Sequence, residues 1–440
     1  MITKFKKIKG GVVLPHDKQT SEIATITMPI PELVEIPMMQ HIGAPCELLV
    51  AKGDPVFVGQ LIGDTAKFVS APIHSSVSGQ VLETKEIILY NNVKVASVVI
   101  KTDGLQTLSK DISIPDISTK ENFLKAVRSS GLTGLGGAGF PAHVKLNTKD
   151  RIPDCLIVNA VECEPKITCD YRAIIEDGPM IVRGIQLILD KLSIPKAYIG
   201  IEDNKPLAVK KLEELIAKDS RIEIANLKTR YPQGAEKMLI YAITGKKVPV
   251  GGLPIDIGVI VMNVTSIFAL SEYCETGMPL ITKRITVDGG AVLKKGNYHV
   301  AIGTYIKDVA KYCEVDIEKT VKILFGGPMM GMTAKDLNEP IIKQNNALLF
   351  MVKEDLDFIQ QSACIRCGRC VDACPMGLMP LTMNIYALKN MPEEMEKYNI
   401  MSCIECGACS YVCPAKRYLV QSFRVGKDRL RKAKAKAKNE

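Results

Sequence analysis

The chain carries the sequence CIRCGRCVDACP at residues 364–375 and a second copy of its pattern, CIECGACSYVCP, at residues 403–414. Both copies follow C-x2-C-x2-C-x3-C-P, a spacing typical of [4Fe-4S] sites, because two-residue gaps let three thiolates converge from one tight turn. The fourth cysteine of such a motif reaches the neighbouring cube when two motifs are present. The sequence therefore predicts two clusters with crossed ligands. One would be held by Cys364, Cys367, Cys370 and Cys413, and the other by Cys403, Cys406, Cys409 and Cys374.

Two other uses of clustered cysteines fit this pattern less well. Zinc prefers four ligands in two well-separated pairs, and a disulfide framework is typical of small secreted proteins. Gly368 and Gly407 lie between the second and third cysteines of each motif, where a residue without a Cβ lets the backbone curl around the sulfur atoms. The repeated glycine favours the iron–sulfur interpretation.

Length and composition indicate a multidomain protein, because 440 residues can form several cores. The sequence has no run of about eighteen uncharged apolar residues and no amino-terminal signal peptide, so we expect a soluble, cytoplasmic chain without a transmembrane span. Of the 14 cysteines, those outside the two motifs show no pairing pattern, so we expect reduced thiols. These are Cys46, Cys155, Cys163, Cys169, Cys274 and Cys313.

The formal net charge is +9, and much of the excess lies in a basic carboxyl-terminal tail at residues 424–440. Such a tail could contact nucleic acid, anionic lipid or an acidic protein. It could equally be a solvated chain end, which is the interpretation that we favour.

Residues 1–105 contain short strands between turns and no helical periodicity, which indicates a small β-barrel or sandwich. The pattern G-D-x-V-x-x-G-Q-x-I from Gly53 to Ile62, followed by Ala71 to Gly79, resembles a biotinyl/lipoyl-type barrel-sandwich domain. A carrier domain of that type presents a lysine for modification at a hairpin tip, whereas this chain has His74-Ser75-Ser76. We therefore predict a docking domain.

The next domain, residues 106–270, begins with a predicted helix at 122–130 and a glycine-rich loop. Gly134, Gly136 and Gly139 match G-x-G-x-x-G, but a dinucleotide fingerprint needs a strand before the glycines and a helix directly after them. Here a helix precedes and Phe140-Pro141 follows, so we reject that interpretation. The loop is either plainly flexible, or its bare N–H groups approach a phosphate or an aromatic ring system.

Strands and helices then alternate, as expected for an α/β domain. Strands are predicted at 155–158, 197–201, 222–225 and 259–263, and helices at 181–192, 205–218 and 238–244. Asn159, Glu162 and Glu164 follow the first of these strands, at the edge where α/β sheets collect their ligands. Strand pairs around one helix then predict a β-grasp domain at residues 271–340, before the double-cluster domain at 341–423.

Taken together, these features resemble the C subunits of Rnf-type, membrane-associated ferredoxin:NAD oxidoreductases over essentially the full chain. The middle of the chain is similar to the flavin subunit of respiratory complex I. The resemblance rests on the G-x-G-G-A-G-F-P loop with Lys145, on the N-A-x-E-x-E-P segment from Asn159, and on two later segments, Tyr231 to Glu236 and Asn263 to Ser266. It implies a multidomain α/β and α+β fold with four domains. These are a barrel-sandwich domain, a central α/β FMN-binding domain, a β-grasp (soluble-ligand-binding) domain and a helical double [4Fe-4S] ferredoxin-like domain.

The resemblance also implies site residues. FMN would be bound by Gly134, Gly136, Gly137, Gly139, Lys145, Asn159, Glu162, Tyr231, Asn263 and Ser266. NAD(H) would contact Phe140, Glu164 and Glu236. The chain departs from the complex I pattern at Val161, Ala235 and Met262, where that family has an aspartate, a glutamate and an asparagine.

The implied function is an exchange of hydride between NAD(H) and FMN, coupled to single-electron transfer through two [4Fe-4S] clusters. No side chain is expected to act as a catalytic acid or base, because the flavin carries the chemistry. The resemblance places the chain peripherally on the cytoplasmic side of the membrane, among other membrane and iron–sulfur subunits, with ferredoxin bound through another subunit and no nucleic acid bound. Two alternatives remain: an electron-wiring subunit without flavin, and a scaffold or nucleic-acid-binding protein that uses the basic tail.

Overall fold

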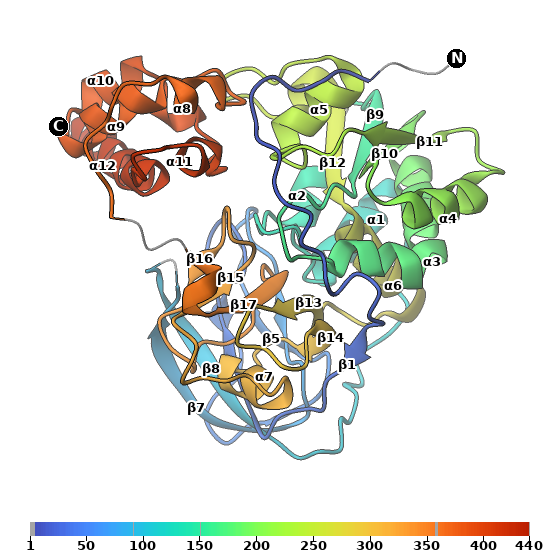
Figure 1. Ribbon diagram of the computed structural model, residues 1–440. Coiled ribbons are helices and arrows are strands. Elements are labelled where there is room, and N and C mark those ends of the chain that lie inside the picture. The colour runs from blue at the N-terminus through green and yellow to red at the C-terminus, as the bar shows by residue number, and fades with distance from the viewer. Residues whose placement is uncertain (1–4, 91, 150, 357–359, 440) are drawn as a thin grey trace.

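The computed structural model describes residues 5–90, 92–149, 151–356 and 360–439, with side chains up to residue 436. Figure 1 shows two β-rich parts packed together, an α/β part next to them, and a helical carboxyl-terminal part. This arrangement confirms the predicted multidomain fold class. Within the described ranges, none of the helices combines the length and the apolar composition that crossing a bilayer requires.

The barrel-sandwich part consists of two antiparallel sheets. The first has the strand order β2 (Leu33–Pro37), β8 (Lys94–Thr102), β7 (Gly79–Ile88) and β4 (Pro55–Val56), and the second has β3 (Glu47–Leu48), β5 (Leu61–Asp64) and β6 (Ile73–His74). Alternate residues along each strand point into the space between the sheets. Val34, Ile36, Ile62, Ile73 and Val98 are completely buried there.

The hairpin tip of this part is buried within the folded protein. A carrier domain would present its lysine at this tip. His74, Ser75 and Ser76 are all less than 9% exposed, and the Ser76 hydroxyl donates to the carbonyl of Ile302 at 2.5 Å. Nearby, Lys343 donates to the carbonyls of Pro72 and Gly131, each at 2.7 Å. The tip therefore docks onto the other domains of the same chain.

The α/β part has a four-stranded parallel sheet of order β11 (Ile222–Leu227), β10 (Ala197–Glu202), β9 (Cys155–Asn159) and β12 (Val259–Asn263). One face packs against α1 (Lys120–Ser129), α3 (Cys169–Leu192), α4 (Pro206–Ile216) and α6 (Val264–Thr276). The other face packs against α5 (Glu236–Thr244). The short helix α2 (Ala142–Leu146) follows the glycine-rich loop.

Helix α3 is much longer than the predicted 181–192, because it begins at Cys169. Its backbone is kinked at Asp177 (φ −115°, ψ 19°), directly before Gly178-Pro179. Proline lacks an N–H and glycine is a poor helix former, so the sequence pattern ends there even though the helix does not.

The β-grasp part has a six-stranded sheet of order β1 (Ile26–Thr27), β14 (Gly296–Ala301), β13 (Thr282–Asp288), β17 (Ala347–Met351), β15 (Lys322–Phe325) and β16 (Met332–Thr333). Helix α7 (Ile306–Tyr312) packs on it through Ile306 and Val309. The sheet takes β17 from beyond residue 340, and β1 from the amino-terminal end of the chain.

The first described residues, Phe5–Met28, run outside the barrel and are called the strap here. The strap exchanges two backbone hydrogen bonds between Val12 and Tyr231 of the α/β part, 2.7 and 2.9 Å long. Gly11 donates its N–H to the carbonyl of Ala373 in the helical part at 2.9 Å. Further on, β1 joins the β-grasp sheet. The strap therefore ties three parts of the molecule together.

The helical part contains α8 (Arg369–Asp372), α9 (Pro380–Leu388), α10 (Pro392–Lys397), α11 (Ala408–Tyr411) and α12 (Leu419–Asn439). Residues 424–439, expected as a separate tail, continue α12. Phe423, Lys427 and Leu430 are buried, whereas residues 431–436 are exposed. The side chain of Lys438 lies outside the described residues. The buried part of the expected tail therefore ends at Leu430, and beyond it Lys434 forms an ion pair with Glu396 of α10.

Candidate functional site

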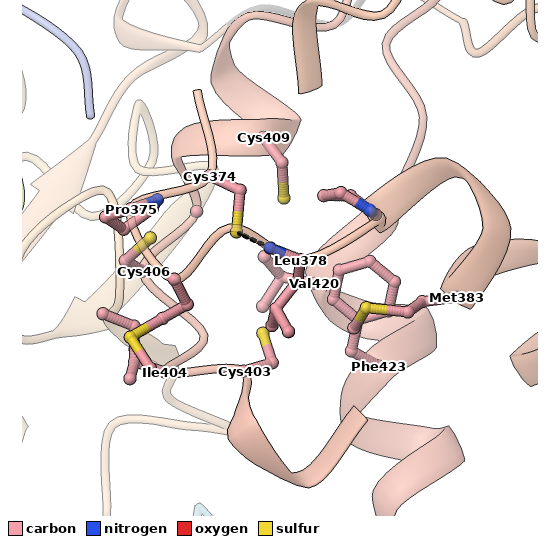
Figure 2. Close-up of a pocket in the computed structure, with 13 residues that line it drawn as sticks. Cys374, Pro375, Leu378, Met383, Cys403, Ile404, Cys406, Cys409, Val420 and Phe423 are labelled. Atoms are coloured by element: carbon pink, nitrogen blue, oxygen red, sulfur yellow. Dashed lines mark hydrogen bonds between the residues drawn. The ribbon is translucent and has the colours of Figure 1, made fainter. Parts of the chain in front are cut away.

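Four cysteines from both motifs line one cavity in the helical part (Figure 2). Cys374 comes from the first motif, and Cys403, Cys406 and Cys409 come from the second; we call this set the inner site. In Figure 2 the sulfur atoms of Cys374, Cys403 and Cys409 point into the same space, which is closed by apolar side chains such as Met383 and Phe423. The structure thus brings together the four residues that the crossed-ligand prediction assigns to one cluster.

The chemistry of the inner site fits an iron–sulfur cluster. Burial raises the pKa of the Cys406 thiol to about 11 and raises that of Cys409 further, and in both cases the neighbouring thiols add to the shift. Thiols in such surroundings become thiolates only when a cation binds them. The cavity lining supplies these thiols and apolar groups, which suits a cluster held by four thiolates.

We call the four cysteines that the prediction assigns to the other cluster, Cys364, Cys367, Cys370 and Cys413, the outer site. Cys364 and Cys367 lie on an exposed loop, while Cys370 and Cys413 are partly buried. Burial raises the pKa of the Cys370 thiol and Cys413 adds to the shift, which identifies the two as electrostatic neighbours. The outer site is therefore the one that faces solvent.

The two motifs share one backbone geometry. Gly368 and Gly407 have φ of 79° and 80°, and Arg366 and Glu405 have φ of 55° and 56°. The N–H of Arg366 donates to the Cys364 sulfur, and that of Glu405 to the Cys403 sulfur, each at 3.4 Å. Positive φ at these positions turns the N–H groups toward the sulfur atoms, as the repeated glycine suggested.

A second candidate site lies at the carboxyl ends of β9 and β12. Asn159 and Asn263 are the last residues of these paired strands and face each other in the register. The connection from β9 leads to β10 on one side, whereas β12 lies on the other side, so this is the point where the strand order reverses. Open α/β sheets bind ligands in such a crevice.

The glycine-rich loop covers this crevice. Gly134 donates to the carbonyl of Phe140 at 2.8 Å, and Gly139 donates to that of Gly134 at 3.1 Å, which closes a compact turn. Gly136 and Gly137 are exposed, and a Cβ on Gly136 would lie 3.1 Å from the amide nitrogen of Asn263. The bare backbone is therefore what lets the loop approach Asn263. Ser266, buried, accepts the N–H of Leu135 at 2.9 Å and so holds the loop rather than facing the crevice.

A cation and an amide complete the crevice. Lys145 Nζ lies 2.9 Å from Glu236 Oε2, and their side chains are 30% and 40% exposed. The Asn159 side chain donates to the carbonyl of Gly234 at 2.9 Å. An accessible ammonium and exposed N–H groups suit a phosphate, and the glycine loop suits a flat ring, so these residues fit FMN.

Besides Ser266, three predicted ligand residues make contacts within the protein. Glu162 accepts the N–H of Asp170 at 2.7 Å at the start of α3, and burial raises its pKa to about 7. Glu164 accepts the N–H groups of Met329 and Met330 at 3.0 and 2.9 Å, so it joins the α/β part to the β-grasp part. Tyr231 is 2% exposed, and its hydroxyl donates to the carbonyl of Cys406 at 2.6 Å. Phe140 is half-buried at the end of the loop.

The structure also shows where the three residues that depart from the complex I pattern lie. Met262 points into the core between the sheet and its helices, and Val161 packs with α5. Ala235 precedes α5 and caps it without a side-chain hydrogen bond. None of these side chains fills the crevice between Asn159 and Asn263.

Glu162, Cys169 and Asp170 place ligand atoms within 4.8 Å of one another. The carboxylate of Asp170 accepts from Asn263 at 2.7 Å and from Thr265 at 2.6 Å, and that of Glu162 accepts from the α3 backbone. Protein donors thus satisfy both carboxylates. This cluster fixes Asn263 and the start of α3.

Two important lysines were not predicted. Lys18 of the strap donates to the carbonyls of Glu162, Glu164 and Ile167 at 2.9, 2.7 and 2.5 Å, and nothing in its local sequence signals this. Lys427 of α12 is 6% exposed and donates to the carbonyl of Cys403 at 2.6 Å. Its helical spacing from Phe423 and Leu430 was a readable signal that it lies on the buried face.

Comparison with protein families matches three regions of the chain. Residues 6–105 match a "RnfC Barrel sandwich hybrid domain", residues 127–272 a "Nuo51 FMN-binding domain", and residues 356–414 a "4Fe-4S dicluster domain". The three matches follow the order of the barrel, the crevice and the cysteine motifs.

Relatives match over nearly the whole chain. The C subunit of the proton-translocating ferredoxin:NAD(+) oxidoreductase complex of Clostridium ljungdahlii is 43% identical over 98% of this chain and 95% of its own length. The C subunit of the Na(+)-translocating complex of Acetobacterium woodii is 43% identical over 97% of this chain and 98% of its own length. Among solved structures, NAD+-reducing [NiFe]-hydrogenase in the H2-reduced state is similar in fold, with a TM-score of 0.51, 18% identity, and coverage of 71% of this chain and 63% of that one.

Proposed function

Because the chain belongs to the family of C subunits of ion-translocating ferredoxin:NAD oxidoreductases, we propose that it exchanges a hydride between NAD(H) and FMN and passes single electrons through two [4Fe-4S] clusters. It is one subunit of an oxidoreductase, and its partners are NAD(H) and the other subunits of that complex. Ferredoxin reaches it through another subunit.

FMN supplies, when bound, the conversion between a two-electron hydride and single electrons. The residues of this chain bind and orient it. The N–H groups of Gly136 and Gly137 and the Lys145 ammonium are available for its phosphate and ring, while Asn159 and Asn263 form the floor of the crevice. Glu236, beside Lys145 and exposed, is available to the nucleotide. No side chain is needed as a catalytic acid or base.

The observation that carries the electron path is the hydrogen bond of 2.6 Å from Tyr231 to the Cys406 carbonyl. Val12, Tyr231, Ala373, Cys406 and Ala408 form one buried apolar cluster between the α/β part and the inner site. Apolar packing excludes water from this contact and keeps the separation fixed. The order that we propose is therefore FMN, inner cluster, outer cluster, and then the partner subunit at the exposed loop of Cys364 and Cys367.

The direct test is anaerobic purification of the full chain, with FMN, iron and sulfide counted in one sample. The proposal expects one FMN and about eight iron and eight sulfide atoms per chain. A chain that holds both clusters but no flavin, even after incubation with FMN, is instead the electron-wiring subunit. A chain without clusters overturns the proposal.

We also propose that the chain sits peripherally on the cytoplasmic side of the membrane. The cysteines outside the two motifs are all free thiols in the structure, which suits a reducing compartment. Protease digestion of inverted and right-side-out vesicles tests the side. Cleavage in inverted vesicles alone is expected, and cleavage in right-side-out vesicles contradicts the proposal.

The means of attachment is a separate question. The barrel was predicted as the docking surface, and the exposed end of α12 is the competing candidate. Because α12 is buried in the helical core as far as Leu430, a deletion of residues 432–440 keeps that packing and removes the exposed Lys434–Glu396 ion pair. We expect this deletion to leave the chain on salt-washed membranes, since lipid contacts made by lysines are screened by salt and protein interfaces are not.

A further inference from the structure

We propose that Lys427 sets the reduction potential of the inner cluster, by holding a buried positive charge against the backbone of a cluster ligand. This inference rests on the proposed function, because it presupposes that the inner site holds a cluster. It concerns a residue outside both cysteine motifs, on the helix that the sequence presented as a basic tail.

The contacts of Lys427 are short and buried. Its Nζ donates to the carbonyl of Cys403 and to Glu405 Oε1, each at 2.6 Å, and its side chain is 8% exposed. Arg424, one helical turn earlier, contacts the other oxygen of Glu405 at 2.9 Å. Two cations therefore share one carboxylate, which leaves a net positive charge beside Cys403.

The outer site offers an internal comparison. Arg366 stands where the inner motif has Glu405, with the same backbone conformation and the same N–H to sulfur contact. Arg366 is exposed, so water screens its charge. At the inner site Lys427 is buried and its partners Glu405 and Arg424 are partly buried, and a charge in a low-dielectric environment acts more strongly on its neighbours. The two sites thus share a geometry but differ in their electrostatic surroundings.

Reduction adds one electron to a cube and makes the set of cube and four thiolates more negative. Burial opposes that change, because a larger charge is poorly solvated in an apolar cavity. A buried cation favours it. We infer that Lys427 offsets the burial of the inner cluster and keeps it reducible, so that electrons can pass between the outer cluster and the flavin.

The test is a reductive titration of the anaerobically purified full chain, followed by the paramagnetic signals of the two clusters. Lys427→Met should lower the midpoint potential of the inner cluster and leave that of the outer cluster unchanged. Lys427→Arg should leave the potential of the inner cluster near that of the unsubstituted chain, because arginine keeps the positive charge. Glu405→Gln should raise it, because an anion is lost while the cation stays. Lys432→Met is the matched control, since Lys432 lies on the same helix with its side chain 76% exposed.

The potential shifts expected for Lys427→Met and Glu405→Gln have opposite signs, which separates an electrostatic effect from structural damage. If Lys427→Met loses the inner cluster altogether, Glu405→Gln decides, and an unchanged potential in that variant overturns the inference. Equal shifts of both clusters in Lys427→Met, or no shift, also overturn it. Absence of both signals in the unsubstituted chain would instead refute the proposed function.

Discussion

The hydroxyl of Tyr231 lies 2.6 Å from the backbone oxygen of Cys406, and this hydrogen bond joins the flavin-binding part to the inner cluster site. Tyr231 is also the residue that exchanges backbone hydrogen bonds with Val12 of the strap. One buried residue thus contacts the strap through its backbone and the helical part through its side chain. Its position explains how two separately folded parts can keep a fixed spacing, which electron transfer between cofactors requires.

Tyr231→Phe should slow electron transfer between the flavin and the inner cluster while FMN content stays the same. The substitution leaves the Cys406 carbonyl without its donor, at a cost of about 1–3 kcal/mol. Rapid mixing of the reduced chain with NAD+ measures the transfer, and fluorescence after denaturation measures FMN. A loss of FMN, with normal transfer in the fraction of chains that still holds FMN, would return Tyr231 to the flavin-binding set that family resemblance suggested.

Crossed ligation predicts different spectra for two single substitutions. Cys374→Ala should damage the cluster held mainly by Cys403, Cys406 and Cys409, and Cys413→Ala should damage the other. The cavity of Figure 2 gives the reason, because Cys374 lines it together with those three residues. Paramagnetic spectra of both variants decide. If each change removes the cluster of its own motif, the assignment is wrong.

Lys145→Ala should weaken FMN binding by about 1–3 kcal/mol, because a charge-assisted hydrogen bond to the ligand is lost. Asn159→Ala should act in the same direction. Titration of flavin-free chain with FMN, followed by fluorescence quenching, gives the affinities. Lys125→Ala is the control, since Lys125 is an exposed residue on α1. An affinity for the Lys145 variant equal to that of the control would remove Lys145 from the site.

Glu164 predicts a pH dependence of stability. Burial raises its pKa from 4.5 to about 7, although the N–H groups of Met329 and Met330 oppose the shift. The folded state therefore holds this proton more tightly than the unfolded state. The stability that Glu164 contributes through this proton is fully present below about pH 4.5 and is lost as the pH rises through about 7.

Glu164→Gln has no carboxyl group to titrate, so it does not lose this stability as the pH rises. From pH 5.5 to pH 8, the free energy of unfolding of the variant should therefore rise relative to that of the unsubstituted chain, on the order of 2 kcal/mol. Thermal unfolding at the two pH values measures the difference. The exposed Glu318→Gln serves as the control. Parallel pH dependence in the Glu164 variant and the unsubstituted chain would show that this carboxyl does not titrate on unfolding.

Much of the fold could be predicted from the sequence, because the patterns that indicate it are local. The strands β9, β10 and β12 are short apolar runs with polar boundaries, and the two cysteine motifs are local patterns with a fixed geometry. Helix α3 was predicted only from residue 181, because the Gly178-Pro179 pair imitates a helix boundary inside a packed helix. Helix α1, predicted at 122–130, begins two residues earlier at Lys120, because Thr119 caps it.

The contacts that were missed join residues far apart in the chain. Lys18 reaches three carbonyls near Ile167, and the strap reaches Tyr231 and Ala373, but a short polar segment carries no periodicity that would reveal this. The contacts of Glu164 and Tyr231 within the protein were missed for the same reason. Resemblance placed both near the ligands, and only the packing of the β-grasp and helical parts shows which groups they contact.

The central claim is that the inner cluster is the obligatory link between the flavin and the outer cluster. The measurement is to reduce Cys409→Ser, which lacks an inner-site ligand, remove the reductant, add NAD+, and follow the outer-cluster signal. The account predicts that this signal persists, whereas both clusters of the unsubstituted chain are oxidised and the inner cluster of Cys364→Ser is oxidised as well. Oxidation of the outer cluster in Cys409→Ser at the unsubstituted rate, with the inner cluster shown to be absent, would contradict it.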